Sequence, residues 1–471
     1  MRRRRRRWGL RGVVFATGAL GGAWLCLPAL AGLPAPFDKK PDLMLRLPGN
    51  PDTWIRPSFR MDGALFFESN AWAGNSRKIL GDHVGAWGEF GVVPGLEGQL
   101  SLADAGALRA RVSGVYTTTQ IGLDAAGSNL DPRHPNKFLL EDAYVGWTSG
   151  VLFPSLGTDA IDLSIGSQPY QAGTGLLFCD GSTNGGKRGG YWISLRKAFR
   201  FTGIARLTSG PLLVEGMFLR PYDEPNTSTK VAGANVEYSF GDRGTVGGGY
   251  WNVVASKDER REGLNVFDLR GEVHPLPSLI GLGLAGEIVR ERNGSKNNSW
   301  GGYAGVDYDF GDDVAWKPYV GYRYAAFQGD DGTGDNRSFD PLFYGSSDWN
   351  QWYLGEILGQ YVATNRNALV NLLHLRASPI DALTLHAFYL NFRLDELSNE
   401  VVSRPPSRDR RALIESKNVG NEFDFVVDWS VTDYLSVSGV AAVFLPSSGA
   451  KDFFGASGTW SDLMLYTSLK F

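Results

Sequence analysis

The chain has 471 residues, of which 43% are hydrophobic and 12% aromatic, with 61 glycines and a formal net charge of −3. Its mean hydropathy of −0.19 excludes a bundle of membrane-spanning helices, because each such helix needs a run of about 18 or more apolar residues. No such run follows residue 40. Length alone allows either several soluble domains or one large domain.

The N-terminus has the pattern of a secretory signal. The basic stretch MRRRRRRWGLR precedes the apolar stretch GVVFATGALGGAWLCLPAL, and Ala29-Leu30-Ala31 has the small residues of a cleavage site. We therefore predict that residues 1–31 are a cleaved signal peptide, with an uncleaved anchor as the alternative. A lipoprotein signal at Cys26 is disfavoured, because the small residue expected before a lipidated cysteine is missing.

Export changes the charge and the cysteine content. Residues 1–31 contain seven arginines and no acidic residue, so cleavage leaves 40 basic and 50 acidic residues, a net charge of −10. Nucleic acid is therefore excluded as a partner, since its binding needs clustered positive charge. Cys179 is then the single cysteine, so we expect extensive backbone pairing or a large core rather than a disulfide.

The remaining chain alternates between apolar and polar residues with a period of two. The segments also run for about ten residues or more, which matches a tilted strand that crosses a bilayer. The sides with apolar residues are Phe267, Leu269 and Val273 in NVFDLRGEV, Ala304, Val306, Tyr308 and Phe310 in GGYAGVDYDF, and Phe423, Phe425, Val427 and Trp429 in NEFDFVVDW. The opposite sides carry Asp268, Arg270 and Glu272; Asp307 and Asp309; and Glu422, Asp424 and Asp428.

Short and long connections also alternate along the chain, which is typical of an outer-membrane barrel. The short turns are 241–243, 311–313, 378–381 and 431–433, and the long loops are 221–230, 255–262, 291–299, 328–365, 396–417 and 446–459. We predict an all-β protein, a single antiparallel transmembrane β-barrel of about 18 strands, with 16 as the alternative. Residues 58–471 would form the barrel and residues 32–57 a short periplasmic segment. A soluble periplasmic or secreted β-protein is the competing interpretation.

The stretch GYRYAAFQGDDGTGDNRSFDPLFYG, residues 321–345, shows where one strand leaves the membrane. We expect the turns to be periplasmic, the loop from Gln328 extracellular, and FDPLFYG to anchor the loop against the barrel mouth or in the lumen. The last strand ends on Phe471, as expected for the C-terminal signal that the barrel assembly machinery recognises. Residues expected to face lipid are Trp316, Val320, Tyr322, Tyr324 and Ala326, and those expected to face the lumen are Lys317, Tyr319, Gly321 and Arg323.

Several longer motifs resemble the alginate export family of outer-membrane barrels. They are LLEDAYVGW, DLSIGSQPYQAGTGLLF, GGYWISLR, SFDPLF, LTLHAFYLNFRLDE and GNEFDFVVDWSVTDYLSVSGVAAVFLP, and they span most of residues 138–471. The resemblance implies a monomeric barrel through which a polysaccharide leaves the cell. Where the family would have an arginine in a GRQ motif, this chain has Gly166-Ser167-Gln168. Alternation places Gly166 and Gln168 in the lumen and Ser167 outside, unless a bulge reverses them.

Candidate residues for the substrate path are polar side chains assigned to the lumen. In such a channel, cations would offset the charge of an acidic glycan and aromatic rings would stack on sugars. For each cation, a structural ion pair with a neighbouring strand is the alternative, favoured for Arg270 by its acidic neighbours. The candidates are Arg109, Arg111, Arg196, Arg270, Arg323, Tyr389, Asn391 and Arg393.

We therefore predict a channel in the outer membrane of a Gram-negative envelope that exports a polysaccharide, for which an acidic, alginate-like glycan is one candidate. A general diffusion porin for small solutes is the alternative, which the mixed lumen charge favours. The five histidines are scattered and no hydrolase motif is present, so we expect no enzymatic activity, catalytic residue, cofactor or metal. Outer-membrane lipid, the cargo, the assembly machinery and periplasmic export proteins are the expected partners.

Overall fold

The computed structural model describes residues 43–222, 226–276, 278–345, 353–397 and 414–471. All of them belong to one compact unit, Lys40–Phe471. The predicted signal peptide lies outside the described residues. None of the helices in this described part combines the length and apolar character of a membrane span.

The unit consists almost entirely of antiparallel strands, joined by a few short helices. The strands are β1 (Leu45–Leu47), β2 (Asn50–Ser69), β3 (Ala86–Ser101), β4 (Ala107–Gln120), β5 (Asn136–Thr148), β6 (Ile161–Gln168), β7 (Phe199–Ser209), β8 (Leu212–Arg220), β9 (Lys230–Ser239), β10 (Gly244–Ala255), β11 (Asn265–Val273), β12 (Leu282–Arg292), β13 (Asn298–Asp309), β14 (Tyr319–Phe327), β15 (Ala368–Ile380), β16 (Leu383–Arg393), β17 (Asn418–Ser430), β18 (Leu435–Pro446) and β19 (Trp460–Lys470). The helices are η2 (Ala71–Gly74), α1 (Ser76–Leu80), η3 (Ala103–Ala105), η4 (Gly186–Arg188), η5 (Gly241–Arg243), η6 (Leu358–Val362) and α2 (Ser448–Phe454).

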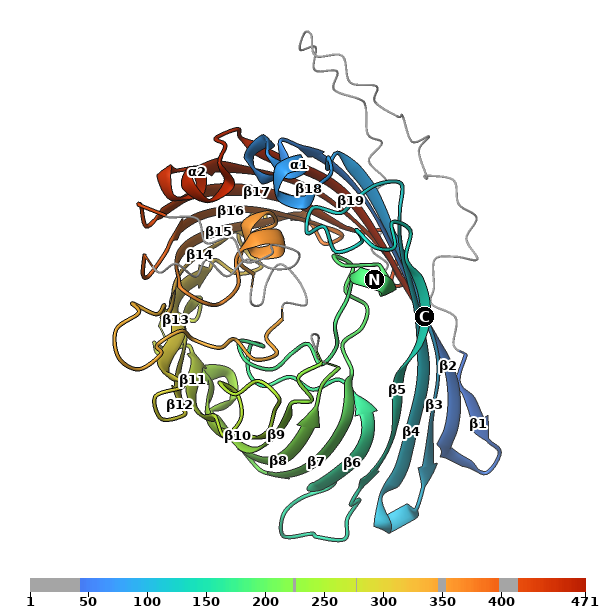
Figure 1. Ribbon diagram of the computed structural model, residues 1–471. Helices are drawn as coiled ribbons and strands as arrows, with labels where there is room; N and C mark the ends of the chain where they lie inside the picture. The colour runs from blue at the N-terminus through green and yellow to red at the C-terminus, as the bar shows by residue number, and fades with distance from the viewer. Residues whose placement is uncertain (1–42, 223–225, 277, 346–352, 398–413) are drawn as a thin grey trace. The chain divides into compact units, whose positions relative to one another are not determined.

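Strands β2 to β19 close into an 18-stranded barrel, as the sequence predicts. Each pairs with its neighbours in the chain, and β19 returns to pair with β2, as in Met464 opposite Phe66. The view down the barrel in Figure 1 shows this ring. Closure gives the backbone N–H and C=O groups of the barrel strands a partner on both sides. A sheet in lipid requires this because no water is available there.

The two ends of the barrel differ in the length of their connections. Short turns such as 210–211, 240–243, 381–382 and 431–434 lie at the end where β2 begins and β19 ends. The connections at the other end include 169–198, 328–367 and 394–417. This asymmetry confirms the predicted alternation of short and long links. Backbone pairing begins at Leu45, within the residues assigned from sequence to a periplasmic segment, because β2 extends past the end of β19 to pair with β1 and β3.

The outer face of the wall is apolar. Leu269 is 65% exposed and Phe423 is 48% exposed, while their strand neighbours Asp268 and Asp424 are buried on the inner side. Tyr322 and Tyr324 also lie on the outer face, as predicted. An apolar band of this kind matches the hydrocarbon core of a bilayer.

Two long connections fold back into the barrel and fill much of its interior (Figure 1). The lumen segments, defined here as residues 169–198, 339–345 and 353–363, pack apolar side chains against the inner wall. The ring centroid of Phe339 lies 5.4 Å from that of Phe327 on β14, and that of Phe343 lies 6.4 Å from that of Phe178. The FDPLFYG stretch is therefore anchored inside the lumen, one of the two places expected from its sequence.

Candidate functional site in the lumen

Three of the predicted lumen cations are held in ion pairs on the inner wall. Arg109 binds Asp162 at 2.5 Å. Arg111 lies 2.9 Å from Asp142 and 3.1 Å from a second carboxylate, that of Glu97. Arg270 pairs with the carboxylates of Asp268 and Glu237. Each of these arginines therefore makes a structural ion pair, which was the alternative to direct contact with cargo.

Glycines allow two of these arginines to reach across a whole strand. Gly146 on β5 lies between Arg109 on β4 and Asp162 on β6, and a Cβ there would come within 2.8 Å of the Arg109 Nε atom. On β10, Gly247 occupies the equivalent place between Arg270 on β11 and its partner on β9. The missing side chains therefore leave room for ion pairs that brace three strands at once.

Arg196 and Arg323 contact the lumen segments. Arg196 is buried inside the barrel, where its Nε donates to Ser182 Oγ at 3.1 Å and its guanidinium lies 5.3 Å from the ring of Tyr222. Arg323 points inward from β14 and donates to the backbone carbonyl of Tyr353. Arg323 therefore links β14 to a lumen segment, whereas Arg196 makes a hydrogen bond within its own lumen segment.

The inward placement predicted for Tyr389, Asn391 and Arg393 is wrong. Tyr389 lies opposite Leu373 and Phe423, two exposed residues of the outer face, and therefore points outward. Asn391 and Arg393, the next alternate residues of β16, point the same way. The Tyr389 hydroxyl donates to Asn421 Oδ1 at 2.9 Å, and Asn391 Nδ2 donates to the same atom at 3.0 Å. A hydrogen-bonded belt of Tyr and Asn near the long-loop end is suited to the membrane interface.

The apolar side of β16 points into the barrel instead. Phe388, Leu390 and Phe392 are buried, and the ring centroid of Phe388 lies 4.7 Å from that of Tyr353 in a lumen segment. The alternation was correct, but the apolar side of β16 faces the filled lumen and the polar side faces lipid.

A bulge also changes the orientation expected around Gly166. The register between β6 and β7 shifts between Gly166 and Gln168, which buries Ser167 as well as Gln168. The Ser167 hydroxyl donates to the backbone carbonyls of Glu141 and Phe199. Gln168 Nε2 points inward and donates to Ser164 Oγ at 2.9 Å. Ser167 therefore stabilises the bulge. The bulge that the sequence left open as an alternative is present.

Carboxylates of the inner wall hold the lumen segments by their backbone. On β3, Glu89 Oε2 accepts from the amides of Trp192 and Ile193, both at 2.9 Å. On β17, Glu422 accepts from those of Ile357 and Leu358, at 2.6 and 2.8 Å. The same arrangement recurs at Glu141, which accepts from Lys197 and Ala198, at Asp424, which accepts from Glu356, and at Glu291, which accepts from Asp340.

Trp192 joins the two lumen segments to each other. Its Nε1 donates to the Glu356 carboxylate, and its ring centroid lies 5.3 Å from that of Tyr466 on β19. Burial, with the nearby charges of Asp462 and Asp424, raises the pKa of the Glu356 carboxyl well above its usual value. The two segments therefore meet in a buried, hydrogen-bonded core inside the barrel.

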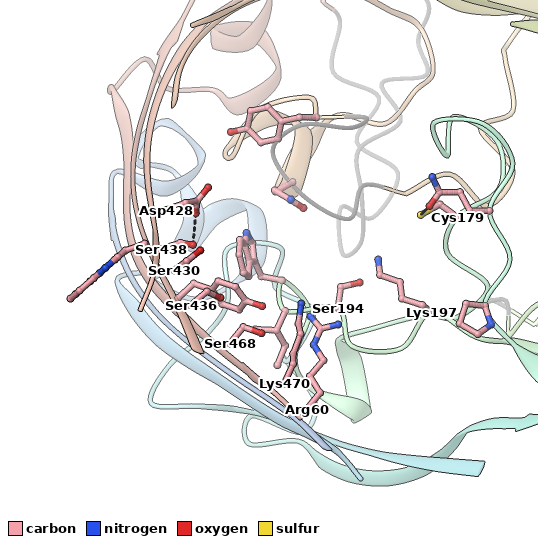
Figure 2. A pocket seen from close by; sticks show the side chains of 18 of the residues that line it. Arg60, Cys179, Ser194, Lys197, Asp428, Ser430, Ser436, Ser438, Ser468 and Lys470 are labelled. Atoms are coloured by element: carbon pink, nitrogen blue, oxygen red, sulfur yellow. Dashed lines mark hydrogen bonds between the residues drawn. The ribbon is translucent and has the colours of Figure 1, made fainter. Parts of the chain in front are cut away.

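A cavity of about 560 Å³ remains between this core and the wall. Figure 2 shows Arg60 and Lys470 on the wall and Lys197 on the lumen segment across from them. Aromatic rings and hydroxyl groups complete the lining. The charged lining residues are Arg60, Lys197, Arg206, Lys470 and Asp428, the aromatic ones include Tyr170, Trp192, Tyr353 and Tyr466, and the hydroxyls are those of Ser194, Ser430, Ser436, Ser438 and Ser468.

Among the described residues, four cations and one carboxylate line the cavity, and we call it electropositive in this sense only. The acidic partners of three of these cations, Asp62, Asp180 and Glu215, are not among the lining residues. Burial acts to lower the pKa of the Lys197 ammonium, but its neighbours, Asp180 foremost, together raise it, so the net shift is upward and the group stays charged. A negatively charged solute would meet attraction here from several directions.

These residues were not predicted from the sequence, for identifiable reasons. Arg60 on β2 and Lys470 on β19 occupy inward-facing positions, which the alternation of these strands could have predicted. Lys197 lies before β7, which begins at Phe199, so strand alternation does not assign its side chain to a face. No sequence signal shows that residues 190–198 fold into the lumen.

The closed barrel, the apolar outer face and the polar interior define an outer-membrane β-barrel channel of the porin-like class. Within it, residues 265–454 match the family model described as alginate export. The match confirms the resemblance for this part of the chain, and the resembling motifs before residue 265 lie outside it. No curated protein is similar enough in sequence to count as a match.

Solved structures share the fold at low sequence identity. Pseudomonas aeruginosa OpdK, crystallised with vanillate, has a TM-score of 0.55 and 11% identity, with 88% of this chain and 98% of that chain covered. OccK5 (OpdH) of the same organism has a TM-score of 0.53 and 11% identity over 88% and 98%. OccD3 (OpdP), also from this organism, has 0.52 and 9% over 88% and 91%.

Proposed function

We propose that this channel carries an acidic polysaccharide out of the cell and that the electropositive cavity is the point where the chain of sugars is recognised. The combination of Arg60, Lys197, Arg206 and Lys470 with aromatic rings and serine hydroxyls carries this proposal. Uronate sugars present a carboxylate, hydroxyls and an apolar ring face, which these three kinds of group complement. The match of residues 265–454 to the alginate export family supports the same cargo class.

Passage of small organic anions is the second candidate function. The lumen segments narrow the barrel to a cavity of about 560 Å³, a volume suited to a small solute. OpdK, which shares the fold, was crystallised with the small aromatic carboxylate vanillate. The two candidates differ in the size of the anion that the cavity accepts.

Block of ionic current in planar bilayers separates the two candidates. We expect an oligouronate to block the wild-type channel at about 0.1 M salt and the block to weaken as salt rises, because the attraction is electrostatic. The double variant Arg60→Gln, Lys197→Gln should need about tenfold more oligouronate for the same block. The matched charge change Lys296→Gln, at an exposed loop residue, should leave the block unchanged.

The opposite result favours the small-solute channel. Block by vanillate with no response to the oligouronate at low salt would contradict polysaccharide export. Equal block of the wild type and the double variant by the oligouronate would remove the cavity from the substrate path.

We further propose that the short turns are periplasmic, that residues 1–31 are removed on export, and that periplasmic export proteins deliver the cargo at the end with the short turns. Gly332 lies exposed in the connection between β14 and β15, at the long-loop end. A protease site inserted after Gly332 should be cut in intact cells without loss of the barrel. Cleavage only after the outer membrane is permeabilised would reverse this orientation.

A further inference from the structure

Two exposed arginines lie on the outer face of the barrel, where β12 reaches the long-loop end. They are Arg290 and Arg292. Arg290 lies opposite Phe267 on β11 and Trp300 on β13, which are 47% and 42% exposed on the outer face. Arg292 is two residues further along the strand and therefore points the same way. Both arginines thus project from the face of the barrel that meets lipid.

The neighbouring strands surround these arginines with a layered surface. Outward residues that pair across β10 to β13 form three rows, which run from the rim towards the middle of the wall. The rim row is Asn252, Asn265, Arg292 and Asn298, the second row is Tyr250, Phe267, Arg290 and Trp300, and the third row is Gly248, Leu269, Ile288 and Gly302. We call the first two rows the arginine patch. The order from polar through aromatic to aliphatic follows the change from headgroups to acyl chains within one leaflet of a bilayer.

Hydrogen bonds orient the arginine patch without neutralising it. Arg290 Nη1 donates to the backbone carbonyl of Ser299 at 3.3 Å and its Nη2 donates to Asn298 Oδ1, so the guanidinium is turned towards the rim. In the part of the chain that the structure describes, no carboxylate lies within ion-pair distance of Arg290 or Arg292. Asp335 Oδ2 accepts instead from Asn298 Nδ2, at 3.5 Å. The patch therefore keeps both positive charges and most of its guanidinium donors.

The chemistry of the arginine patch matches that of a phosphorylated sugar headgroup. An arginine that faces lipid is destabilising in the middle of a bilayer and tolerated at the interface, where anionic headgroups attract it. A phosphate accepts paired hydrogen bonds from the planar guanidinium fork. The amides of Asn252, Asn265 and Asn298 can donate to and accept from sugar hydroxyls, and Tyr250 and Trp300 are residue types that favour headgroup depth.

We propose that the arginine patch binds a glycolipid with a phosphorylated sugar headgroup in the outer leaflet of the outer membrane. Arg290 and Arg292 hold a phosphate, the asparagines contact the sugar, and Leu269 and Ile288 lie against the acyl chains. The site lies on the outside of the barrel, so it serves either candidate cargo. It rests on the proposed orientation, in which the long-loop end is extracellular.

Native mass spectrometry of the folded, full-length barrel in a neutral detergent tests this proposal. The probe is an acylated glucosamine disaccharide that carries two phosphates. The double variant Arg290→Gln, Arg292→Gln should bind this glycolipid at least about tenfold more weakly than the wild type, because hydrogen bonds to a charged phosphate are lost. The matched variant Arg46→Gln, Arg243→Gln removes two charges from exposed residues at the short-turn end and should bind like the wild type.

Three further probes identify what the patch recognises. The same glycolipid without phosphates should bind the wild type at least about tenfold more weakly, and phosphatidylglycerol, which has a phosphate but no sugar, should also bind more weakly. The phosphorylated disaccharide without acyl chains should not displace the intact glycolipid. Equal binding of the phosphorylated glycolipid by the wild type and the Arg290→Gln, Arg292→Gln variant would overturn the proposal. Phosphatidylglycerol binding as tight as that of the glycolipid, or displacement by the unacylated disaccharide, would overturn it as well.

Binding in detergent does not depend on how the barrel is oriented in the cell. The protease site after Gly332 tests that orientation separately, so a failure of the orientation and a failure of the lipid site give different results. Heat-modifiable mobility of each variant shows that the barrel is folded before binding is measured.

Discussion

Replacing Glu422 with alanine should raise the single-channel conductance several-fold, because it releases a lumen segment from the wall. Glu422 is fully buried and accepts hydrogen bonds from the amides of Ile357 and Leu358. Loss of these two bonds, which leaves two buried amides without an acceptor, would weaken the docking of the segment by about 2 kcal/mol or more. The cavity would then open towards the cross-section of the barrel itself.

Two further variants test whether the effect comes from this contact. Glu422→Gln keeps one acceptor oxygen and should give an intermediate conductance. Gly355 has φ +94°, and a Cβ there would lie 2.6 Å from Glu422 Oε1, so Gly355→Ala should also raise conductance. Glu272→Ala, at an exposed inner-face residue of β11, is the matched control and should leave conductance unchanged.

Bilayer recordings of each folded variant give the measurement, and heat-modifiable mobility reports that the barrel is intact. A Glu422→Ala channel with wild-type conductance and full folded yield would show that the segment stays in place without this carboxylate. The wall carboxylates would then be incidental to the width of the channel.

The sequence predicted the barrel well because strand alternation and connection length are local properties. The apolar side of β11 that carries Leu269 and the polar side that carries Arg270 follow directly from a period of two. The division into short turns and long loops followed from Gly, Asp and Pro positions alone. These signals need no knowledge of what lies across the lumen.

The orientation of β16 could not be predicted in the same way. A period of two shows which residues share a side, but the side that faces lipid is inferred from its apolar character. That inference fails where Phe388 and Leu390 pack against a lumen segment rather than against lipid. Tyr389 and Asn391 then occupy the outer face, where both donate hydrogen bonds to the side chain of Asn421.

The cavity was unpredictable for a further reason, since it depends on contacts between distant segments. Lys197 faces Arg60 and Lys470 only because Glu89 and Glu141 hold residues 192–198 against the wall. Motifs that carried the family resemblance occupy these places. GGYWISLR and SFDPLF lie in the lumen segments, and GNEFDF supplies the Glu422 that holds one of them.

Deleting Phe471 should sharply reduce the amount of folded barrel in the outer membrane, because this residue completes the seam that closes the ring. Its amide donates to the carbonyl of Phe59 on β2 at 2.8 Å, and its ring stacks on Tyr434 with the centroids 5.2 Å apart. An open seam would leave strand edges without hydrogen-bond partners in lipid, at a cost of several kcal/mol for each group.

The variant Phe471→Ala separates the two contributions of this residue. It keeps the backbone pairing with Phe59 and loses only the ring, so a yield as low as that of the deletion would show that the assembly machinery recognises the aromatic side chain. Leu463→Ala, an outward-facing change in the middle of the same strand, should fold normally. The measurement is the heat-modifiable band in outer-membrane fractions, and secretion across the inner membrane should stay intact. If the deletion gives a normal folded yield, the seam closes without its last residue, and pairing between the rest of β19 and β2 is sufficient for assembly.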